Sequence, residues 1–373
     1  MMQIPFHDFN KQPKPRKKKL TKAINKVIAS NYFILGKQVA LFEKEFAKYL
    51  NASYCIGVGN GLEAIQIALL ALQIGPGDAV ITTPLSAVAT TLAIIAVGAI
   101  PVFVDTNEKG LLDPTHIIGA INKQTKAILP VHLYGQPCDI AAMEKITRKY
   151  NLFLLEDAAQ AHGTTIGSKK IGTFGQLGCF SFYPTKNLGT FGDGGAIVTN
   201  NKKLANICRE IRDYGQQTKY VHIRYGLNSR LDELHAAILR VKLTYLESDN
   251  KKRRNLAKRY IKNLSNLPLE IVTNSPEENF HLFVIRTKKR NDLQRYLYEH
   301  GIETAVHYPR IIPEQPFLQG KYSVKNVQIA KKITREIISL PCNPFLSKAQ
   351  IDYICKTIHW FYNKQRVSKA HKE

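Results

Sequence analysis

A single lysine, Lys186, stands in a position suited to covalent chemistry. The aromatic segment 180–183 leads through Pro184 to a turn that presents this lysine, and a glycine-rich segment, 189–195, follows it. Proline marks the end of a strand, and glycines allow the backbone to pass close to a bound group. A lysine placed there can act as a covalent amine toward a carbonyl compound. The alternative is an ordinary solvated lysine.

A second candidate site lies where a predicted strand ends in two acidic residues. Segment 152–155 is apolar, and Glu156 and Asp157 follow it directly. An unpaired carboxylate in a protein interior is costly, so we expect Asp157 to have a cationic partner. That partner is either a lysine or arginine in a structural ion pair or a ligand such as a pyridinium nitrogen. His162 is a candidate catalytic residue, although the pattern favours a hydrogen-bonding histidine over a proton carrier.

Glycines at positions 57, 59 and 61 separate a predicted strand from a predicted helix. Backbone N–H groups in such a turn can face a phosphate, and the helix N-terminus adds a partial positive charge. Asn60 can instead act only as the cap of that helix. Leu62 stands where the dinucleotide-binding fingerprint requires a glycine. The turn therefore predicts a general phosphate site rather than a dinucleotide site.

Apolar strands that alternate with helices must position these three features. This alternation is typical of a mainly parallel sheet that helices cover on both faces, an α/β fold in which ligands bind at the carboxyl ends of the strands. The glycine turn, Asp157 and Lys186 all lie at such ends. Strands are predicted at 54–58, 79–82, 102–105, 127–131, 152–155 and 196–199, and helices at 39–50, 62–72, 86–97, 141–150 and 204–212.

The second half of the chain predicts a smaller domain. One long helix is predicted from Leu231 to about Tyr260, and the pattern changes after Pro268. A strand at 280–286 and helices at 291–300, 327–338 and 349–361 indicate an α+β unit. We therefore expect a basic N-terminal arm over residues 1–20, a large α/β domain over 21–250 and a small C-terminal domain over 251–373.

The composition limits the classes of partner. The chain has 373 residues and a formal net charge of +24, which indicates an anionic partner such as nucleic acid, anionic lipid or a phosphorylated small molecule. Its six cysteines form no C-x-x-C pair, so neither a zinc site nor a disulfide framework is expected. No apolar run follows the basic segment 14–19. We expect a cytoplasmic protein without membrane association, whose basic segment is either a phosphate or nucleic-acid patch or a solvated arm.

A phosphate cradle, a carboxylate for a ring nitrogen and a lysine for an aldehyde match the needs of pyridoxal 5'-phosphate. At these positions the chain also resembles the DegT/DnrJ/EryC1/StrS sugar aminotransferases, and the resemblance covers nearly its whole length. The motifs that carry it are GNGLEA at 59–64, VHLYGQP at 131–137, EDAAQAHG at 156–163, SFYPTKN at 181–187, GDGGA at 192–196, NSRLDE at 228–233 and HYP at 307–309.

The resemblance implies a fold type I pyridoxal-phosphate enzyme with a mainly parallel seven-stranded sheet and a smaller C-terminal α+β domain. It implies that Lys186 forms a Schiff base with the cofactor and then carries a proton between the cofactor carbon and the sugar carbon. Asp157 would hold the pyridinium nitrogen, and Gln160 would contact the side of the ring that bears the hydroxyl.

The same resemblance assigns the phosphate to Ser181 and to the backbone of Gly61 and Leu62. Asn228 would reach this phosphate from the other subunit of a homodimer, although an asparagine there can also cap the helix that follows. Val88 lies where many relatives place an aromatic residue over the cofactor ring, and a valine cannot stack in that way.

The resemblance also indicates the substrates. Tyr183, Arg230, His307 and Tyr308 are candidates for binding the nucleotide sugar or the carboxylate of the amino donor. Lysine at position 186 favours transamination, because relatives that deoxygenate sugars carry histidine there.

We therefore predict a ping-pong aminotransferase that uses glutamate and a nucleoside-diphosphate keto-6-deoxyhexose. Segments 281–286 and 301–309 look most like those of enzymes that aminate dTDP-3-keto-6-deoxyhexoses. A 4-aminotransferase of a UDP-, dTDP- or GDP-4-keto-6-deoxy sugar is the alternative within the family. An NAD-dependent oxidoreductase and a nucleic-acid-binding protein are alternatives of other classes, but the chain lacks the aromatic residues between its charges that a base-stacking surface requires.

Overall fold

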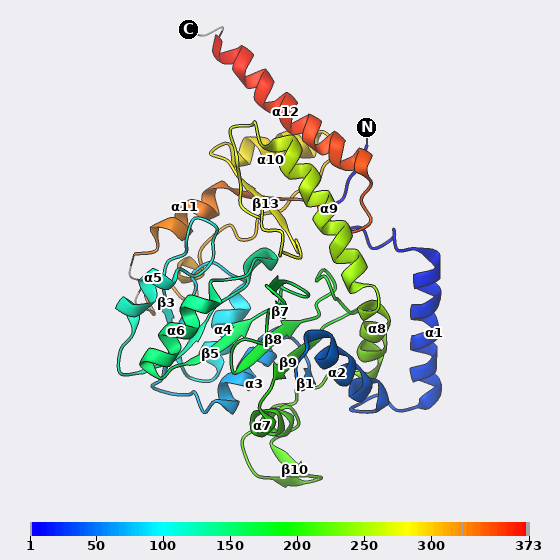
Figure 1. The fold of residues 1–373 in the computed structure, drawn as a ribbon, viewed down its shortest axis with the longest axis vertical. Helices are drawn as coiled ribbons and strands as arrows, with labels where there is room; N and C mark the ends of the chain where they lie inside the picture. Colours follow the sequence, from blue (N-terminus) through cyan, green and yellow to red (C-terminus); the bar gives the residue numbers. More distant parts are fainter. Residues whose placement is uncertain (1, 323, 325, 371–373) are drawn as a thin grey trace.

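The computed structural model describes residues 2–370 except 323 and 325, and a seven-stranded sheet forms its centre (Figure 1). The strand order is β1-β9-β8-β5-β4-β2-β3, and β9 is antiparallel to both of its neighbours while β8, β5, β4, β2 and β3 run parallel. The mainly parallel sheet is therefore confirmed. The strands are β1 (Tyr54–Val58), β2 (Ala79–Thr82), β3 (Ile100–Phe103), β4 (Thr125–Leu129), β5 (Phe153–Asp157), β8 (Leu177–Ser181) and β9 (Gly195–Thr199).

Helices cover both faces of this sheet because successive strand side chains point to opposite sides. In β4, Ala127 and Leu129 join one buried core, whereas Ile128 joins another. Helices α3 (Gly61–Ala71), α4 (Val88–Ala96) and α7 (Lys202–Arg212) supply the first core. The opposite face is covered by α2 (Lys37–Leu50), α6 (Ile140–Tyr150) and α8 (Glu233–Leu243).

The single long helix predicted over 231–260 is wrong, because the chain forms α8 and then α9 (Leu246–Leu264). Thr244 and Tyr245 form a turn between them, in which Tyr245 has φ −107° and ψ −8°. Its ring packs under the guanidinium of Arg16, 4.2 Å from the ring centroid. This tertiary contact accompanies the break, after which α9 runs toward the C-terminal part of the molecule (Figure 1).

The C-terminal part contains a three-stranded antiparallel sheet of β12 (Glu270–Ile271), β13 (Phe283–Arg286) and β14 (Ile337–Leu340). Helices α10 (Arg290–Glu299), α11 (Gln328–Glu336) and α12 (Lys348–Ala370) accompany it. The helix predicted over 327–338 is too long at its end, because Ile337 is extended and begins β14, which pairs with β13.

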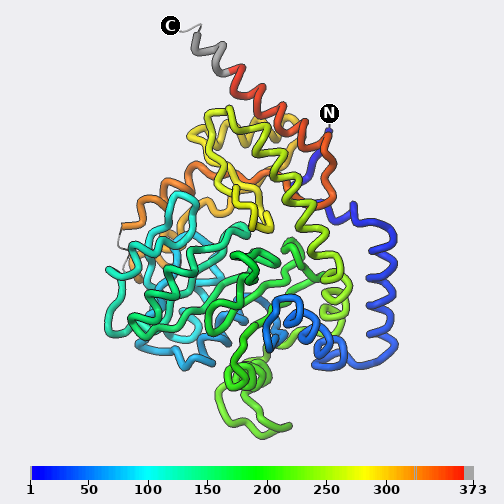
Figure 2. The backbone as a smooth tube through the Cα atoms, in the orientation of Figure 1, coloured from blue at the N-terminus to red at the C-terminus, as the bar shows by residue number. Residues whose placement is uncertain are grey.

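The N-terminal segment follows a defined path through the molecule (Figure 2). The Ile4 amide donates to the Gly301 carbonyl at 2.8 Å, so the segment first contacts the C-terminal part. It then enters α1 (Lys14–Ser30), which lies along α8. The range expected as an arm, 1–20, thus includes the first turns of a helix.

Several short elements complete the described chain. The short elements are α5 (Pro114–Ile117), the 3-10 helices at Ile118–Ala120, Leu133–Gly135 and Ile312–Glu314, and the strands β6 (Thr165–Ile166), β7 (Lys169–Lys170), β10 (Gln216–Thr218) and β11 (Val221–His222).

No described helix combines the length and apolar character needed to cross a bilayer.

Candidate active site

Lys186 lies in the turn between β8 and β9, and Phe182 closes the base of this turn. The Phe182 amide donates to the Gly194 carbonyl at 2.7 Å, and its carbonyl accepts from the Thr190 amide at 2.8 Å. Within the turn, the Lys186 amide donates to the Tyr183 carbonyl at 2.9 Å. The backbone that carries the lysine is therefore fixed by hydrogen bonds on both sides.

Asn187 anchors the same turn to the second half of the chain. Its amide nitrogen donates to Asn250 Oδ1 at 2.8 Å and to the Asn279 carbonyl at 3.1 Å, and its Oδ1 lies 3.2 Å from His281 Nδ1. These contacts join residues more than sixty positions apart, so no local pattern predicts them. They fix the direction in which the neighbouring Lys186 leaves the backbone.

The environment of Lys186 favours its neutral form. Burial lowers the pKa of its ammonium group to about 8, although the nearby Asp157 carboxylate opposes this effect. The side chain borders a small cavity of about 80 Å³, to which the N-terminal segment contributes His7 and Phe9. A neutral amine is the nucleophilic form, so this lysine can act on a carbonyl near neutral pH.

Asp157 ends β5 and receives two hydrogen bonds on its carboxylate. Thr90, on α4, donates its hydroxyl to Oδ2 at 2.8 Å, and the Ala159 amide donates to Oδ1 at 3.1 Å. Burial raises the pKa of this carboxyl group, while the two hydrogen bonds and the charge of Lys186 act in the opposite direction. Within the described chain Asp157 forms no ion pair with a lysine or arginine. The structural ion pair considered for it is therefore not observed.

Glu156 has a structural environment, unlike its neighbour. Three backbone amides of segment 172–175 donate to its carboxylate at 2.7–2.9 Å, and His132 Nε2 lies 3.2 Å from it. Although burial alone would raise the pKa of Glu156, His132 and these amides lower it overall. The carboxylate is fully buried and fully satisfied, so Asp157 alone faces the candidate site.

The N-terminus of α3 forms the predicted phosphate cradle. Asn60 Oδ1 accepts from the Glu63 amide at 2.9 Å, so the capping interpretation holds as well. The amides of Gly61 and Leu62 open the helix and have no intrahelical acceptor. Ser181 lies directly opposite, since a Cβ added to Gly61 would stand only 2.7 Å from that of Ser181. Two amides, a hydroxyl and a helix N-terminus thus meet at a place that only glycine leaves open.

Gln160 connects this site with the C-terminal part. Its Oε1 accepts from the Tyr134 amide at 2.7 Å, and its Nε2 donates to the Tyr308 hydroxyl at 3.4 Å. Burial, with the Asp157 charge, raises the pKa of Tyr308 to about 12. The Tyr134 hydroxyl in turn donates to the His307 carbonyl at 2.5 Å. The predicted residues Gln160, His307 and Tyr308 are therefore brought together.

His162 is fully buried beside the rings of Phe180 and Phe182, at centroid distances of 5.5 and 5.7 Å. Neither ring nitrogen makes a hydrogen bond of normal geometry in the described chain. The nearby Ser181 backbone acts to raise the pKa of the ring, but it does not outweigh burial. Burial lowers the pKa of His162 to about 3, and Lys186 adds to this effect. The expected hydrogen-bonding histidine is thus a neutral ring in an aromatic enclosure.

The remaining predicted residues lie at the margins of the site. Tyr183 is 53% exposed at the turn, and Asn228 is exposed. Arg230 pairs with Asp213 at 3.1 Å, so its charge is already engaged within this chain. Val88 begins α4 and packs against the small apolar cluster around Phe103.

Thr90 is the site residue that the sequence analysis missed. It follows Val88 on the first turn of α4, and its only sequence signal is a hydroxyl residue near the start of the helix predicted over 86–97. Ser86 Oγ lies 3.1 Å from Thr90 Oγ1, so the two hydroxyl groups share a hydrogen bond.

These groups fit pyridoxal phosphate. The cradle suits its phosphate, the buried carboxylate without a cationic side-chain partner suits its pyridinium nitrogen, and the amine of lowered pKa suits its aldehyde. In the part of the chain that the structure describes, no group of three His, Cys, Asp or Glu side chains could hold a metal ion.

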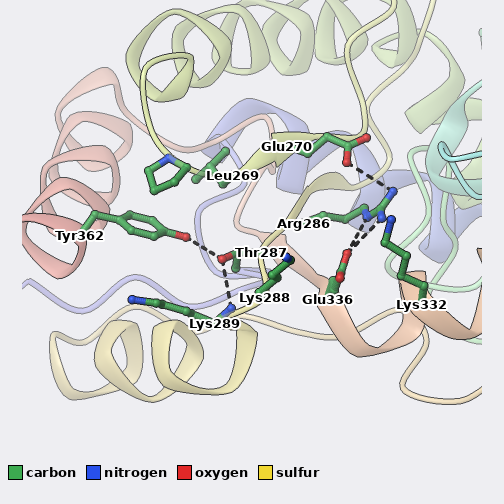
Figure 3. A pocket seen from close by; sticks show the side chains of 10 residues that line it. Leu269, Glu270, Arg286, Thr287, Lys288, Lys289, Lys332, Glu336 and Tyr362 are labelled. Atoms are coloured by element: carbon green, nitrogen blue, oxygen red, sulfur yellow. Dashed lines mark hydrogen bonds and ion pairs between the residues drawn. The ribbon is translucent and has the colours of Figure 1, made fainter. Parts of the chain in front are cut away.

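A larger cavity of about 560 Å³ lies in the C-terminal part (Figure 3), and Lys186 does not line it. The buried guanidinium of Arg286 lies beside it and contacts the carboxylates of Glu108, Glu270 and Glu336 at 2.8, 3.3 and 3.0 Å. This ion cluster ties β13 to β12 and α11, so we assign it a structural role. The cavity is lined by Pro268, Leu269, Glu270, Arg286, Thr287, Lys288, Lys289, Lys332, Glu336 and Tyr362.

Known proteins resemble this chain over nearly its whole length. The model of the DegT/DnrJ/EryC1/StrS aminotransferase family matches residues 15–359. The chain is 42% identical over 359 residues to the dTDP-3-amino-3,6-dideoxy-alpha-D-galactopyranose transaminase of Aneurinibacillus thermoaerophilus, covering 95% of this chain and 99% of that protein.

Solved structures agree with this similarity. DesV of S. venezuelae shares 38% identity with a TM-score of 0.94, over 97% of this chain and 99% of DesV. NtdA of Bacillus subtilis, solved with its bound cofactor PMP, shares 32% identity with a TM-score of 0.92, over 97% of this chain and 86% of NtdA.

Proposed function

Because the chain belongs to the DegT/DnrJ/EryC1/StrS aminotransferase family, we propose that it transfers an amino group from glutamate to the C3 keto group of a dTDP-linked 6-deoxyhexose. The observation that carries the chemistry is the meeting of Lys186, Asp157 and the cradle at one end of the sheet. The name of the relative from Aneurinibacillus supports the dTDP sugar and position 3. The net charge of +24 suits a diphosphate substrate.

The cofactor is pyridoxal phosphate, which when bound supplies an aldehyde that takes up the amino group and a ring that withdraws electrons from the reacting carbon. Gly61, Leu62 and Ser181 would hold the phosphate. Asp157 would keep the ring nitrogen protonated, because a buried carboxylate stabilises a cation beside it. Asp157 is buried and forms no ion pair with a lysine or arginine among the described residues, which supports this role.

Lys186 would hold the aldehyde carbon covalently and then move the proton that transamination transfers. A pKa near 8 lets its Nζ both accept and release a proton close to neutral pH. Asn187 would keep the side chain directed at the reacting carbon. Gln160 and Tyr308 would orient the edge of the cofactor ring. His162, which is neutral at pH 7, would help to position the cofactor ring without exchanging protons.

We further propose a homodimer in which Asn228 reaches the phosphate of the partner subunit. The exposure of Asn228 supports this, as do two exposed tyrosines on the same segment, Tyr220 at 79% and Tyr225 at 75%. Arg230, Tyr183 and His307 would then border the nucleotide sugar. All six cysteines are buried free thiols, which supports a cytoplasmic location.

Absorbance spectroscopy tests the cofactor assignment. The purified enzyme is expected to show the visible absorbance of lysine-bound cofactor and to lose it when glutamate is added. Lys186→Ala should lack this absorbance and all turnover. Lys126→Ala is the control, because this lysine is exposed on β4 and does not line the cavity beside Lys186. Retained absorbance and turnover in Lys186→Ala would contradict the proposal.

Product analysis tests the substrate. The enzyme is incubated with glutamate and either dTDP-3-keto or dTDP- and UDP-4-keto-6-deoxy sugars, and the new amine is located by NMR. Amination at C3 of the dTDP sugar is expected. Exclusive amination at C4 would instead establish the 4-aminotransferase.

A further inference from the structure

A row of four lysines runs along the outer face of α1. Lys14, Lys18, Lys22 and Lys26 follow one another at intervals of four residues, the spacing that places side chains on one face of a helix. All four are exposed. At the rise of an α-helix the row extends over roughly 18 Å.

No partner within the described chain neutralises this row. None of the four lysines forms an ion pair, a hydrogen bond or a ring contact there, in contrast to Lys17 and Lys19 on the same helix. Segment 9–42 contains no Asp or Glu. Like charges at this spacing destabilise a helix, and cations near its N-terminus oppose its dipole. The arrangement therefore works against the local stability of α1.

Contacts on the opposite face hold α1 in place despite this repulsion. Arg16 forms a bidentate pair with Asp249 at 2.7 and 3.0 Å, and Leu20 and Val27 are buried. The helix lies at the edge of the molecule beside α8 (Figure 1). The row is consequently presented to solvent by a firmly packed helix rather than by a flexible tail.

None of the described helices carries three acidic residues at intervals of four, so no described helix of a second copy matches the row charge for charge. Apolar side chains are exposed at the C-terminal end of α1, with Ile28 at 53%, Tyr32 at 58% and Phe33 at 46%. A straight row of cations next to exposed apolar side chains suits a flat anionic surface with an apolar interior.

We propose that α1 attaches the enzyme reversibly to bilayers that contain anionic lipid, with the four lysines facing the headgroups. This differs from the absence of membrane association expected from the sequence. It is independent of the proposed function, because none of the four lysines belongs to the candidate active site.

Vesicle sedimentation tests this proposal with the full-length enzyme. Vesicles of phosphatidylcholine and phosphatidylglycerol are expected to bind it at low salt, whereas vesicles of phosphatidylcholine alone are not. Changing all four lysines of the row to glutamine should weaken binding at least about tenfold, since each lysine near an anionic surface changes partitioning about fivefold. Binding should also fall as salt is raised.

The matched control removes the same charge elsewhere and should retain binding within about twofold of the wild type if position, rather than total charge, decides the interaction. Equal losses in both variants, or no binding by the wild type, would overturn the proposal. The proposal would also be overturned if duplex DNA binding depended on the four lysines of the row and vesicle binding did not. Aminotransferase activity, unchanged in both variants, reports correct folding. The control substitutions are Lys123→Gln, Lys126→Gln, Lys145→Gln and Lys149→Gln, of which the last two lie on α6, across the molecule from α1 (Figure 1).

Discussion

Replacing Thr90 by valine should shift the pH dependence of the enzyme, because it removes one hydroxyl from the Asp157 carboxylate while keeping the shape of the side chain. The bond is 2.8 Å long, and Thr90 and Asp157 are only 1% and 5% exposed. A buried hydrogen bond to an ionised group contributes about 1.5–3 kcal/mol. The amide of Ala159 remains as the second donor.

The sign follows from the form of the carboxyl group that the hydroxyl stabilises. Thr90 donates to the ionised form, so its loss raises the pKa of Asp157 beyond the increase that burial already causes. One pKa unit corresponds to about 1.4 kcal/mol, so the acidic limb of the kcat/KM profile should move about 1–2 pH units toward higher pH. Activity well above that limb should change little.

The assay is kcat/KM for glutamate measured across pH, together with the absorbance of the bound cofactor at each pH. Thr91→Val is the matched control, because the Thr91 hydroxyl is buried on the same helix and has no hydrogen-bond partner in the described chain. Profiles of Thr90→Val and Thr91→Val that both coincide with that of the wild type would refute this role of the Thr90 hydroxyl.

Three further outcomes are expected. Gly61→Ala should weaken cofactor binding about tenfold or more by overfilling the cradle, whereas Gly119→Ala, whose Cβ enters open space, should not; equal affinities by fluorescence titration would argue against the cradle. Arg16→Met should lower the free energy of unfolding by about 3 kcal/mol, because the buried Asp249 loses its bidentate partner and keeps only the half-exposed Lys252 at 3.8 Å, and urea denaturation should show partial recovery when Asp249 is also made apolar. In the cofactor-free enzyme, Lys186 should react with an amine reagent at a rate that rises with pH around a midpoint of about 8, because the ammonium form below that pH is not nucleophilic; a midpoint near 10 by peptide mapping would contradict the lowered pKa.

The central sheet and the residues at its strand ends were predictable because their signals are local. The strand 54–58 and the strand 79–82 have the predicted bounds, since each is a short apolar run between turn residues. Parallel strands end on the same edge of a sheet, so the predicted strand ends place the glycine turn near Asp157. The lysine follows from the proline-marked turn next to them.

The remaining features depend on contacts between distant residues. A polycationic segment predicts a solvated arm, and α1 forms there because Arg16 reaches Asp249 far along the chain. The break between α8 and α9 at Tyr245 accompanies the same contact. The partners of Asn187 come from two other segments, so no spacing along the chain reveals them.

The position of β1 in the sheet has a consequence for synthesis on the ribosome. Its partner in the sheet is β9, whose pairing of Tyr54 with Thr199 spans almost 150 residues. At typical translation rates β1 waits on the order of ten seconds for that partner, and an unpaired apolar strand is prone to aggregate in this interval. The nascent chain therefore depends on early packing of α2 and α3 against β1, or on a chaperone, until β9 emerges. A chain truncated before β9 should accumulate as insoluble protein.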